Sequence, residues 1–298
     1  MTLKKTKFIL TGICLFTLLT AASGIWVYLG YTQFLQTPAD NRAGQTVFVI
    51  KNGQSLKTIS VNLEKEKIIT SGRWFRWMTR LRKADRKLRS GEYVVSASDS
   101  PEQILDIFLK GKVKLYRLTL PEGLNLPETA MRIEQANFCK SQDILKLSKD
   151  PLFIKSLGLE TKTLEGYLFP DTYFFPKNTS CRTILTTLVR RFNQNFTEQW
   201  RLRAAELKLT AAQVVTLASI IEKETGDASE RPVIASVFHN RLKRNMRLES
   251  DPTVIYGIPD FDGNITRKHL RTYTPYNTYK IKGLPPGPIA NPGQLAIR

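Results

Sequence analysis

The sequence predicts an α+β protein with a single N-terminal transmembrane helix, a small α/β module and a larger, mixed α+β domain. Three observations predict this arrangement. Residues 8–30 carry no charged side chain, residues 46–113 alternate strand and helix signals, and residues 114–298 combine a strand pattern with several capped helices. The chain has 298 residues, 42% hydrophobic and 24% charged, which is ordinary globular usage and enough for about two domains.

The uncharged run predicts a membrane anchor. At about 1.5 Å per residue, residues 8–30 are long enough to cross the ~30 Å hydrocarbon layer of a bilayer. Aromatic side chains lie where an interfacial belt is expected, at Trp26, Tyr28 and Tyr31. The alternative is a cleaved signal peptide with Ala21 and Ala22 near the cut, but the run exceeds the apolar region of about 7–15 residues that is usual for a signal.

Charge sets the orientation and the class of partner. Three lysines precede the run: Lys4, Lys5 and Lys7. Residues 1–7 are therefore expected to form a cytoplasmic tail, and the chain after the run is expected to lie outside the cytoplasm. The chain has 45 Lys and Arg against 26 Asp and Glu, a formal charge of +19, which predicts a negatively charged neighbour. Outside the cytoplasm we expect no nucleic acid partner. The candidate negatively charged partners are lipid head groups and carboxylates of a cell-wall polymer.

Histidine and cysteine usage predicts no metal centre and no cofactor. The chain has two histidines, which cannot build a three-histidine site. Its three cysteines share no C-x-x-C spacing, which excludes a zinc knuckle or a disulfide scaffold. Cys139 and Cys181 could pair in an oxidising compartment, but the sequence does not show that they meet.

Residues 31–45 are predicted to be a linker, and residues 46–113 a βααβα module. Residues 47–50 and 91–95 read as strands. Ser55 is expected to cap a first helix, and Ser100, Pro101 and Gln103 provide the start of the last one, which should end near Gly111.

Between those strands, residues 73–90 hold eight Lys or Arg and one acid, Asp85. Trp74, Trp77 and Leu81 recur at helical spacing, which predicts an amphipathic helix with an arginine stripe beside the apolar one: Arg73, Arg76 and Arg80. The apolar stripe either packs on the core, as in an ordinary helix, or contacts a membrane surface or a glycan strand.

In the larger domain, residues 114–120 are predicted to form a strand, residues 126–157 helices, and residues 163–176 an aromatic-rich loop. This loop either packs on the core or forms the wall of a sugar site, because flat rings stack on pyranose faces. Its candidate lining residues are Glu165, Tyr167 and Asp171.

The helix predicted at residues 210–226 carries the strongest catalytic candidate. Thr210 and Gln213 form a capping box, and Gly226 is placed to close the helix in the left-handed conformation. Glu224 leans onto the apolar stripe of the helix, whereas Glu222 leans to its more polar edge. Apolar surroundings raise the pKa of a carboxyl group, so Glu224 is expected to retain a proton that it can donate. The alternative is that both glutamates are solvated at the helix end.

Four segments resemble the endolytic murein transglycosylases of the YceG-like family: LEGYLFPDTYFFP (164–176), ASIIEKETGDASERPVIASVFHNRL (218–242), LESDPTVIYG (248–257) and TPYNTYKIKGLPPGPIANPG (274–293). The resemblance runs from the anchor to Gly293. It implies that residues 46–113 are a LysM-like domain and residues 114–298 the catalytic domain. It also implies that Glu224, the second glutamate of IEKET, is the catalytic acid.

The implied reaction cleaves MurNAc–GlcNAc β-1,4 bonds within nascent peptidoglycan strands, leaves 1,6-anhydro-MurNAc ends and so terminates strand elongation. The resemblance places the chain in the inner membrane, beside peptidoglycan synthases (penicillin-binding proteins). The alternatives are a non-catalytic, membrane-anchored glycan-binding protein and a scaffold for cell-wall synthases. Further residues of the matching segments are candidates for substrate binding, or ordinary helix, cap and turn residues: Asn240, Arg241, Asp251, Tyr276 and Asn277.

The family continues beyond the turn at residues 291–293, whereas this sequence ends at Arg298. The resemblance therefore implies that the C-terminal part of the catalytic domain is missing from this sequence.

Overall fold

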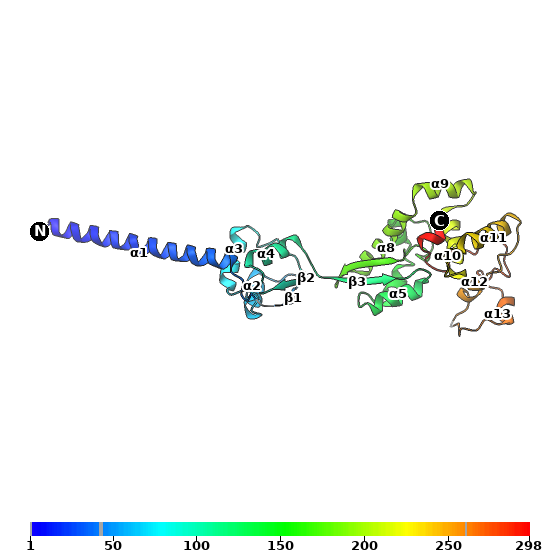
Figure 1. Cartoon of the computed structure of the whole chain (residues 1–298), viewed down its shortest axis with the longest axis horizontal. Helices are drawn as coiled ribbons and strands as arrows, with labels where there is room; N and C mark the ends of the chain where they lie inside the picture. The colour runs from blue at the N-terminus through cyan, green and yellow to red at the C-terminus, as the bar shows by residue number, and fades with distance from the viewer. Residues whose placement is uncertain (1, 42–43, 260) are drawn as a thin grey trace. The chain divides into compact units, whose positions relative to one another are not determined.

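The computed structural model describes residues 2–41, 44–259 and 261–298, with side chains from residue 12 onward. The chain divides into two compact units, Met1–Leu115 and Tyr116–Arg298. Both units combine helices and strands, so the predicted α+β class is confirmed (Figure 1).

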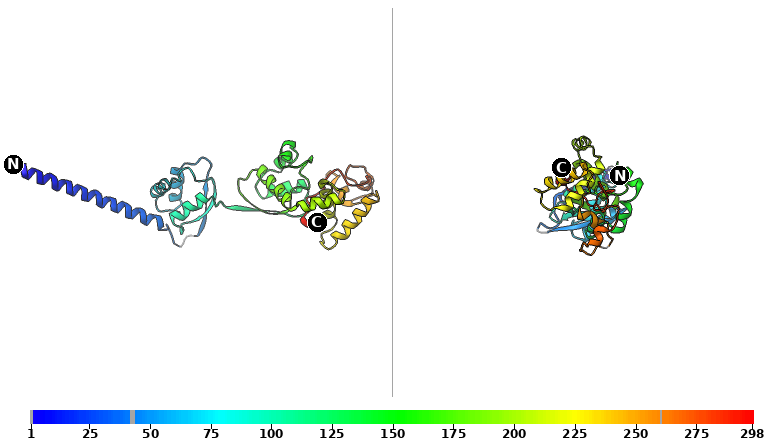
Figure 2. Two further views of the ribbon diagram at one scale, coloured as in Figure 1. Left: turned by 90° about the horizontal axis from the view of Figure 1, so that it is seen from above. Right: turned by 90° about the vertical axis from the view of Figure 1, so that its right-hand side faces the viewer.

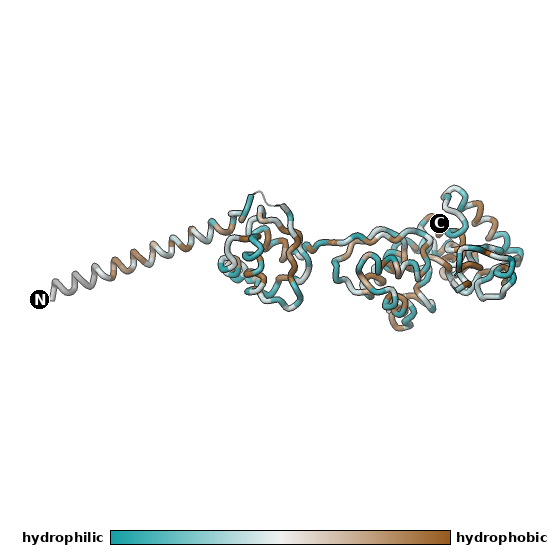
Figure 3. The backbone as a smooth tube through the Cα atoms, turned by 90° about the horizontal axis from the view of Figure 1, so that it is seen from below, coloured by the Kyte–Doolittle hydropathy of each residue, from teal (hydrophilic) through white to brown (hydrophobic). Residues whose placement is uncertain are grey.

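The first unit begins with α1 (Thr2–Gln36), which is long and apolar enough to cross a membrane from Gly12 onward. Figure 2 gives two further views of the fold. In Figure 3, where the backbone is coloured by hydropathy, hydrophobic segments recur along the described part of α1. The side chains of the predicted cytoplasmic tail, residues 1–7, lie outside the described ones. The predicted linker, residues 31–45, is wrong at its start, because the helix continues to Gln36 and Phe34 is buried in the core of the following module. Residues 42 and 43 of that linker lie outside the described residues.

The module that follows has the predicted βααβα order. Its elements are β1 (Gln45–Ile50), α2 (Leu56–Lys65), α3 (Gly72–Leu81), β2 (Gly91–Ser96) and α4 (Pro101–Lys110). The two strands pair antiparallel, from Gln45 opposite Ser96 to Ile50 opposite Gly91. Ser55 and Ser100 cap α2 and α4 as expected, with a full capping box at Ser100, and Gly111 ends α4 in the left-handed conformation.

Helix α3 differs from its prediction in length and in the face it buries. It ends at Leu81, and its buried face holds Phe75 and Met78, which pack into the core of the module. Trp77 and Leu81 of the predicted apolar stripe are 49% and 64% exposed. The alternative in which this stripe packs on the core is therefore wrong for these two residues, because Phe75 and Met78 fill the core instead.

The second unit surrounds a two-stranded sheet with helices. Its strands are β3 (Leu115–Leu120) and β4 (Asp171–Pro176). Its helices are α5 (Leu126–Gln135), α6 (Ser141–Leu147), α7 (Pro151–Ser156), α8 (Cys181–Asn195), α9 (Glu198–Glu206), α10 (Ala211–Glu224), α11 (Arg231–Lys243), α12 (Asp251–Tyr256), α13 (Arg267–Arg271) and α14 (Gln294–Ile297). The second half of the predicted aromatic loop is thus a strand, whose alternate side chains Tyr173 and Phe175 are buried.

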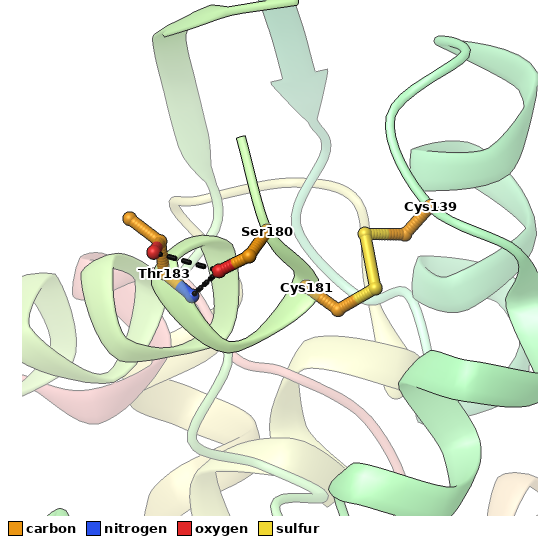
Figure 4. Close-up of a disulfide and its surroundings, with 4 residues drawn as sticks. All are labelled: Cys139, Ser180, Cys181 and Thr183. Carbon is orange, nitrogen blue, oxygen red and sulfur yellow. Dashed lines mark hydrogen bonds between the residues drawn. A yellow bond between two sulfur atoms is a disulfide. The ribbon is translucent and has the colours of Figure 1, made fainter. Parts of the chain in front are cut away.

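A disulfide joins Cys139 to Cys181, the first residue of α8, across 42 positions of the sequence. Figure 4 shows the bond beside the helix start, where the hydroxyl of Ser180 caps α8 by accepting from the backbone N–H of Thr183 at 3.1 Å. The possible pairing of these cysteines is therefore realised in the structure. Such bonds are typical of oxidising compartments and rare in the cytoplasm.

Loss of this disulfide is expected to destabilise the second unit. Cys181→Ser should lower the free energy of unfolding by about 2–4 kcal/mol, because the cross-link closes a long loop of the unfolded chain. Melting followed by circular dichroism, with and without a reductant, measures the effect. Cys14→Ser, which changes an exposed cysteine of α1, is the matched control. Equal melting of the oxidised and reduced chain would show that the bond contributes nothing.

Candidate active site

The candidate site lies at the C-terminal end of α10. The capping box of Thr210 and Gln213 forms as predicted, and the helix interior from Val215 to Ile221 is buried. The predicted left-handed closure at Gly226 is wrong. Helix α10 ends at Glu224, Thr225 takes an extended conformation, and Gly226 is not among the described glycines with positive φ.

Glu222 is the buried glutamate of the pair. Only 5% of its side chain is exposed, and its Oε1 accepts from Nη2 of Arg231 at 2.9 Å. Its Oε2 accepts from the backbone N–H of Gly293 at 2.8 Å. Burial is the main influence on this carboxyl group and raises its pKa. Glu222 therefore ties α10 to α11 and to the C-terminal turn, and all of its oxygens are engaged.

Glu224 is exposed, contrary to the prediction that it leans into apolar surroundings. The physical reason is that α11 approaches the other edge of α10, where Arg231 gives Glu222 a counter-ion. The Oε1 of Glu224 accepts from the hydroxyl of Ser250 at 2.6 Å, and its Oε2 accepts no hydrogen bond from the described residues. Glu224 thus has one oxygen held by the protein and one without a partner among the described residues.

Ser250 is a helix cap that uses its hydroxyl elsewhere. It occupies the N-cap position of α12 without making a side-chain cap hydrogen bond, because the hydroxyl donates to Glu224. Asp251, which was predicted to start this helix as the cap, is instead its first helical residue. The backbone N–H of Ser250 donates to Oγ1 of Thr278 at 3.0 Å, so a buried contact holds Ser250 in place. Sequence reasoning missed Ser250 and Thr278, since a serine before Asp-Pro looks like an ordinary cap.

Tyr279 completes the cluster around Glu224. Its hydroxyl donates to Oδ1 of Asp251 at 2.8 Å. Burial first, and then the negative charges of Asp251, Glu249 and Glu224, raise the pKa of Tyr279 to about 12. Tyr279 therefore stays a neutral hydrogen-bond donor near neutral pH. Glu224 and Asp251 are linked through Ser250, which donates to Glu224 and directly precedes Asp251 in the chain.

The other predicted residues differ in their surroundings. Arg241 donates to the backbone carbonyl of Leu248 and lies 3.7 Å from a carboxylate oxygen of Glu249, so it fixes the segment before Ser250. Asn240 is exposed. Tyr276 is partly buried against Tyr256, with ring centroids 4.8 Å apart.

Asn277 is fully buried and shapes the backbone of its loop. Its amide nitrogen donates to the carbonyl groups of three preceding residues, His269, Leu270 and Thr272. Its Oδ1 accepts from the backbone N–H of Tyr279 at 2.9 Å. The prediction that Asn277 contacts sugar hydroxyls does not fit this burial, and we leave it out of the proposed site.

Tyr167 and Asp171 have partners other than Glu224. Tyr167 is buried against Phe192 and belongs to an apolar cluster that includes Val215 and Ala218 of α10. Asp171 pairs with Arg191 of α8 at 2.7 Å. The structure therefore gives both residues packing or pairing partners rather than a place beside Glu224.

Glu165 is a buried carboxyl group, 3% exposed. Its Oε2 accepts from the backbone N–H of Leu126 at 2.9 Å and from the hydroxyl of Tyr256 at 3.0 Å, while Oε1 has no partner among the described residues. Burial raises the pKa of Glu165 to about 7, although these hydrogen bonds oppose the shift. Glu165 therefore has the desolvated carboxyl group that the sequence analysis assigned to Glu224.

The raised pKa of Glu165 predicts a pH-dependent stability. Between about 4.5 and about 7 the folded chain binds the proton more tightly than the unfolded chain does, so stability should fall as pH rises through this window. The loss should approach about 3 kcal/mol, and Glu165→Gln should reduce it, leaving the smaller contribution of Glu222, whose pKa is also raised. Melting temperatures from pH 5 to 8 measure the slope. Glu160→Gln, which changes an exposed side chain, should keep the wild-type slope, and a wild-type slope in Glu165→Gln would contradict the assignment.

Comparison with known proteins extends over the same residues. Residues 48–298 match the YceG-like family, and this range includes the whole of the candidate site. The chain belongs to this family. The family resemblance read from the four sequence segments is thereby confirmed.

Relatives of this YceG-like chain carry informative names. An endolytic murein transglycosylase of Bacillus subtilis (strain 168) is 33% identical over 281 residues, covering 88% of this chain and 77% of the relative. One of Streptococcus pneumoniae (strain D39) is 29% identical over 325 residues, covering 98% of this chain but only 58% of the relative. A crystal structure of a YceG-like protein from Listeria monocytogenes matches with a TM-score of 0.58 and 34% identity, covering 85% of this chain and 88% of that one.

Proposed function

We propose that this chain is an endolytic murein transglycosylase, a lyase that cleaves MurNAc–GlcNAc β-1,4 bonds within peptidoglycan strands and leaves 1,6-anhydro-MurNAc ends. The family match and the names of the relatives support this reaction. The observation that carries the assignment to a residue is the exposed carboxyl group of Glu224, held through one oxygen by Ser250.

The proposed mechanism uses Glu224 twice. Protonated Glu224 gives its proton to the glycosidic oxygen as the bond from that oxygen to C1 of MurNAc breaks. The 6-hydroxyl of the same sugar then attacks C1, the anhydro bond forms, and the Glu224 carboxylate takes the hydroxyl proton. The step consumes no water, and one carboxyl group with a substrate hydroxyl replaces the second carboxylate of the usual glycosidase scheme.

The geometry suits a group that both donates and accepts a proton. The hydroxyl of Ser250 fixes Oε1, so Oε2 is available to the sugar. Since Glu224 is exposed, the glycan strand itself must cover the carboxyl group during the reaction. Tyr279 and Asp251, which lie beside this carboxyl group, are the candidates for holding sugar hydroxyls.

The anchor and the finer domain assignments belong to the same proposal. The apolar α1 supports a single-pass inner-membrane protein with a cytoplasmic N-terminus. The disulfide of the second unit supports its location outside the cytoplasm. We also propose that residues 46–113 are a LysM-like glycan-binding domain, residues 114–298 the catalytic domain, and that peptidoglycan synthases are its neighbours.

Digestion of purified glycan strands by the full-length chain in detergent tests the reaction. Mass spectrometry should find new 1,6-anhydro ends in the interior-cleavage products. Reducing ends would indicate hydrolysis and contradict the proposal. Binding without any cleavage would instead favour the alternative of a glycan-binding protein.

A further inference from the structure

An aromatic cluster joins α3 to the end of α1. The rings of Trp74 and Trp77 lie 5.7 Å and 6.0 Å from the ring of Tyr31, measured between centroids, and 5.5 Å from each other. Helix α3 is therefore held against the membrane-anchor helix by direct ring contacts.

The outer side of α3 is both apolar and basic, and we call it the α3 face: Arg73, Arg76, Trp77, Arg80 and Leu81. Its two apolar members are among the large hydrophobic side chains that the module leaves exposed. The side chains of its three arginines make no hydrogen bond or ion pair with any described residue, although the backbone carbonyl of Arg80 accepts from the N–H of Lys83. Arg82, one position further, differs because it is paired with two acids of α4, Glu102 and Asp106.

The α3 face lies beside the end of the segment predicted to span the membrane, residues 8–30. A Cβ atom built on Gly30, the last residue of that segment, would lie 3.9 Å from Cζ2 of Trp74. About 20 residues suffice for the hydrocarbon layer, and each head-group region adds about 5–8 Å beyond it. At about 1.5 Å per residue, the ring cluster at Tyr31 then falls at the depth of the head groups.

We propose that the α3 face lies on the bilayer, with Trp77 and Leu81 entering the interface and the three arginines binding anionic lipid phosphates. Tryptophan and arginine are the side chains favoured at this depth. The inference rests on the anchor proposed above. The α3 face would be a second membrane contact beside α1, and it would hold the module against the bilayer surface.

Lipid fits this surface better than a glycan strand. A sugar would stack on Trp77, but exposed Leu81 beside three arginines matches an interface that is apolar beneath and anionic above. The contact also comes at small entropic cost, since α1 already holds the face beside the membrane.

The test uses the full-length chain with Cys14→Ser, reconstituted in nanodiscs of phosphatidylcholine with or without phosphatidylglycerol. A nitroxide is attached at Leu81→Cys, or at Val61→Cys on α2 as the matched exposed control. Nickel chelated to lipid head groups should relax the label at position 81 strongly and the label at position 61 weakly. Co-elution of protein and nanodisc reports incorporation separately.

Charge removal tests the arginines. The variant Arg73→Gln/Arg76→Gln/Arg80→Gln should lose the lipid contact, by about fivefold per arginine, since each is worth about 1 kcal/mol at an anionic surface. The control Lys51→Gln/Lys57→Gln/Lys65→Gln, on exposed lysines elsewhere in the module, should keep it.

Each outcome decides the proposal. Equal relaxation at positions 81 and 61 in incorporated chains would overturn the α3 face and leave the anchor standing. Relaxation that is independent of phosphatidylglycerol and abolished by added glycan strands would assign the face to glycan. Failure of the chain to enter nanodiscs would overturn the anchor and the α3 face together. None of these three outcomes would bear on cleavage by Glu224.

Discussion

Glu224→Gln is expected to abolish the formation of 1,6-anhydro ends while leaving the fold intact. Glutamine keeps the shape of the side chain and still accepts from Ser250, but it can neither give nor take the proton. Loss of this acid–base step should lower the cleavage rate by about 10²–10⁴-fold. The measurement is mass spectrometry of glycan digests, together with a melting curve that should match wild type because the side chain is exposed.

Two neighbouring glutamates separate this effect from a general loss of charge. Glu230→Gln removes an exposed carboxylate that accepts from the hydroxyl of Thr225, just beyond α10, and should leave cleavage near the wild-type rate. Glu222→Gln should act mainly on stability, since Glu222 is engaged by Arg231 and Gly293. Wild-type cleavage by Glu224→Gln, or a specific loss in a well-folded Glu222→Gln, would refute the role given to Glu224.

Arg231→Met is expected to destabilise the second unit by about 3–5 kcal/mol, the usual effect of removing one partner of a buried ion pair. Arg231 is 8% exposed by side chain, and Glu222 would be left buried with the backbone N–H of Gly293 as its remaining close donor. Urea unfolding followed by circular dichroism measures the change.

A double variant distinguishes the unpaired charge from lost packing. Arg231→Met/Glu222→Leu removes both charges, so it should recover much of the stability lost in Arg231→Met. Arg203→Met, which breaks an exposed pair with Glu206, is the matched surface control and should have an effect below about 1 kcal/mol. A double variant no more stable than Arg231→Met would show that the pair is not the cause.

Local signals in the sequence predicted the local structure of the chain well. The caps at Ser55, Ser100 and Thr210 lie within three residues of the groups that they bind, so no distant information was needed. Strand β4 was missed in part because its alternation of Tyr173 and Phe175 is set among other aromatic residues. Periodicity alone also failed to choose between the two sides of α3, since the core selected Phe75 rather than Trp77.

The site depended on partners that are distant in sequence. The order of burial of Glu222 and Glu224 was predicted in reverse, because Arg231 comes from the next helix and no spacing rule places it against Glu222. Ser250, 26 positions beyond Glu224, is equally remote. The family resemblance selected Glu224 without this information, since it compares whole segments rather than the environment of one side chain.

Phe34 of α1 is part of the hydrophobic core of the module that follows. Its ring is part of the interior of the βααβα module, although it belongs to the same helix as the candidate membrane span. A soluble version trimmed at Gln36 would leave a hole where this ring packs, at a cost of about 3–5 kcal/mol for an aromatic residue. The end of α1 is therefore part of the folding unit of the module, and preparations trimmed at the N-terminus should retain residues 31–36.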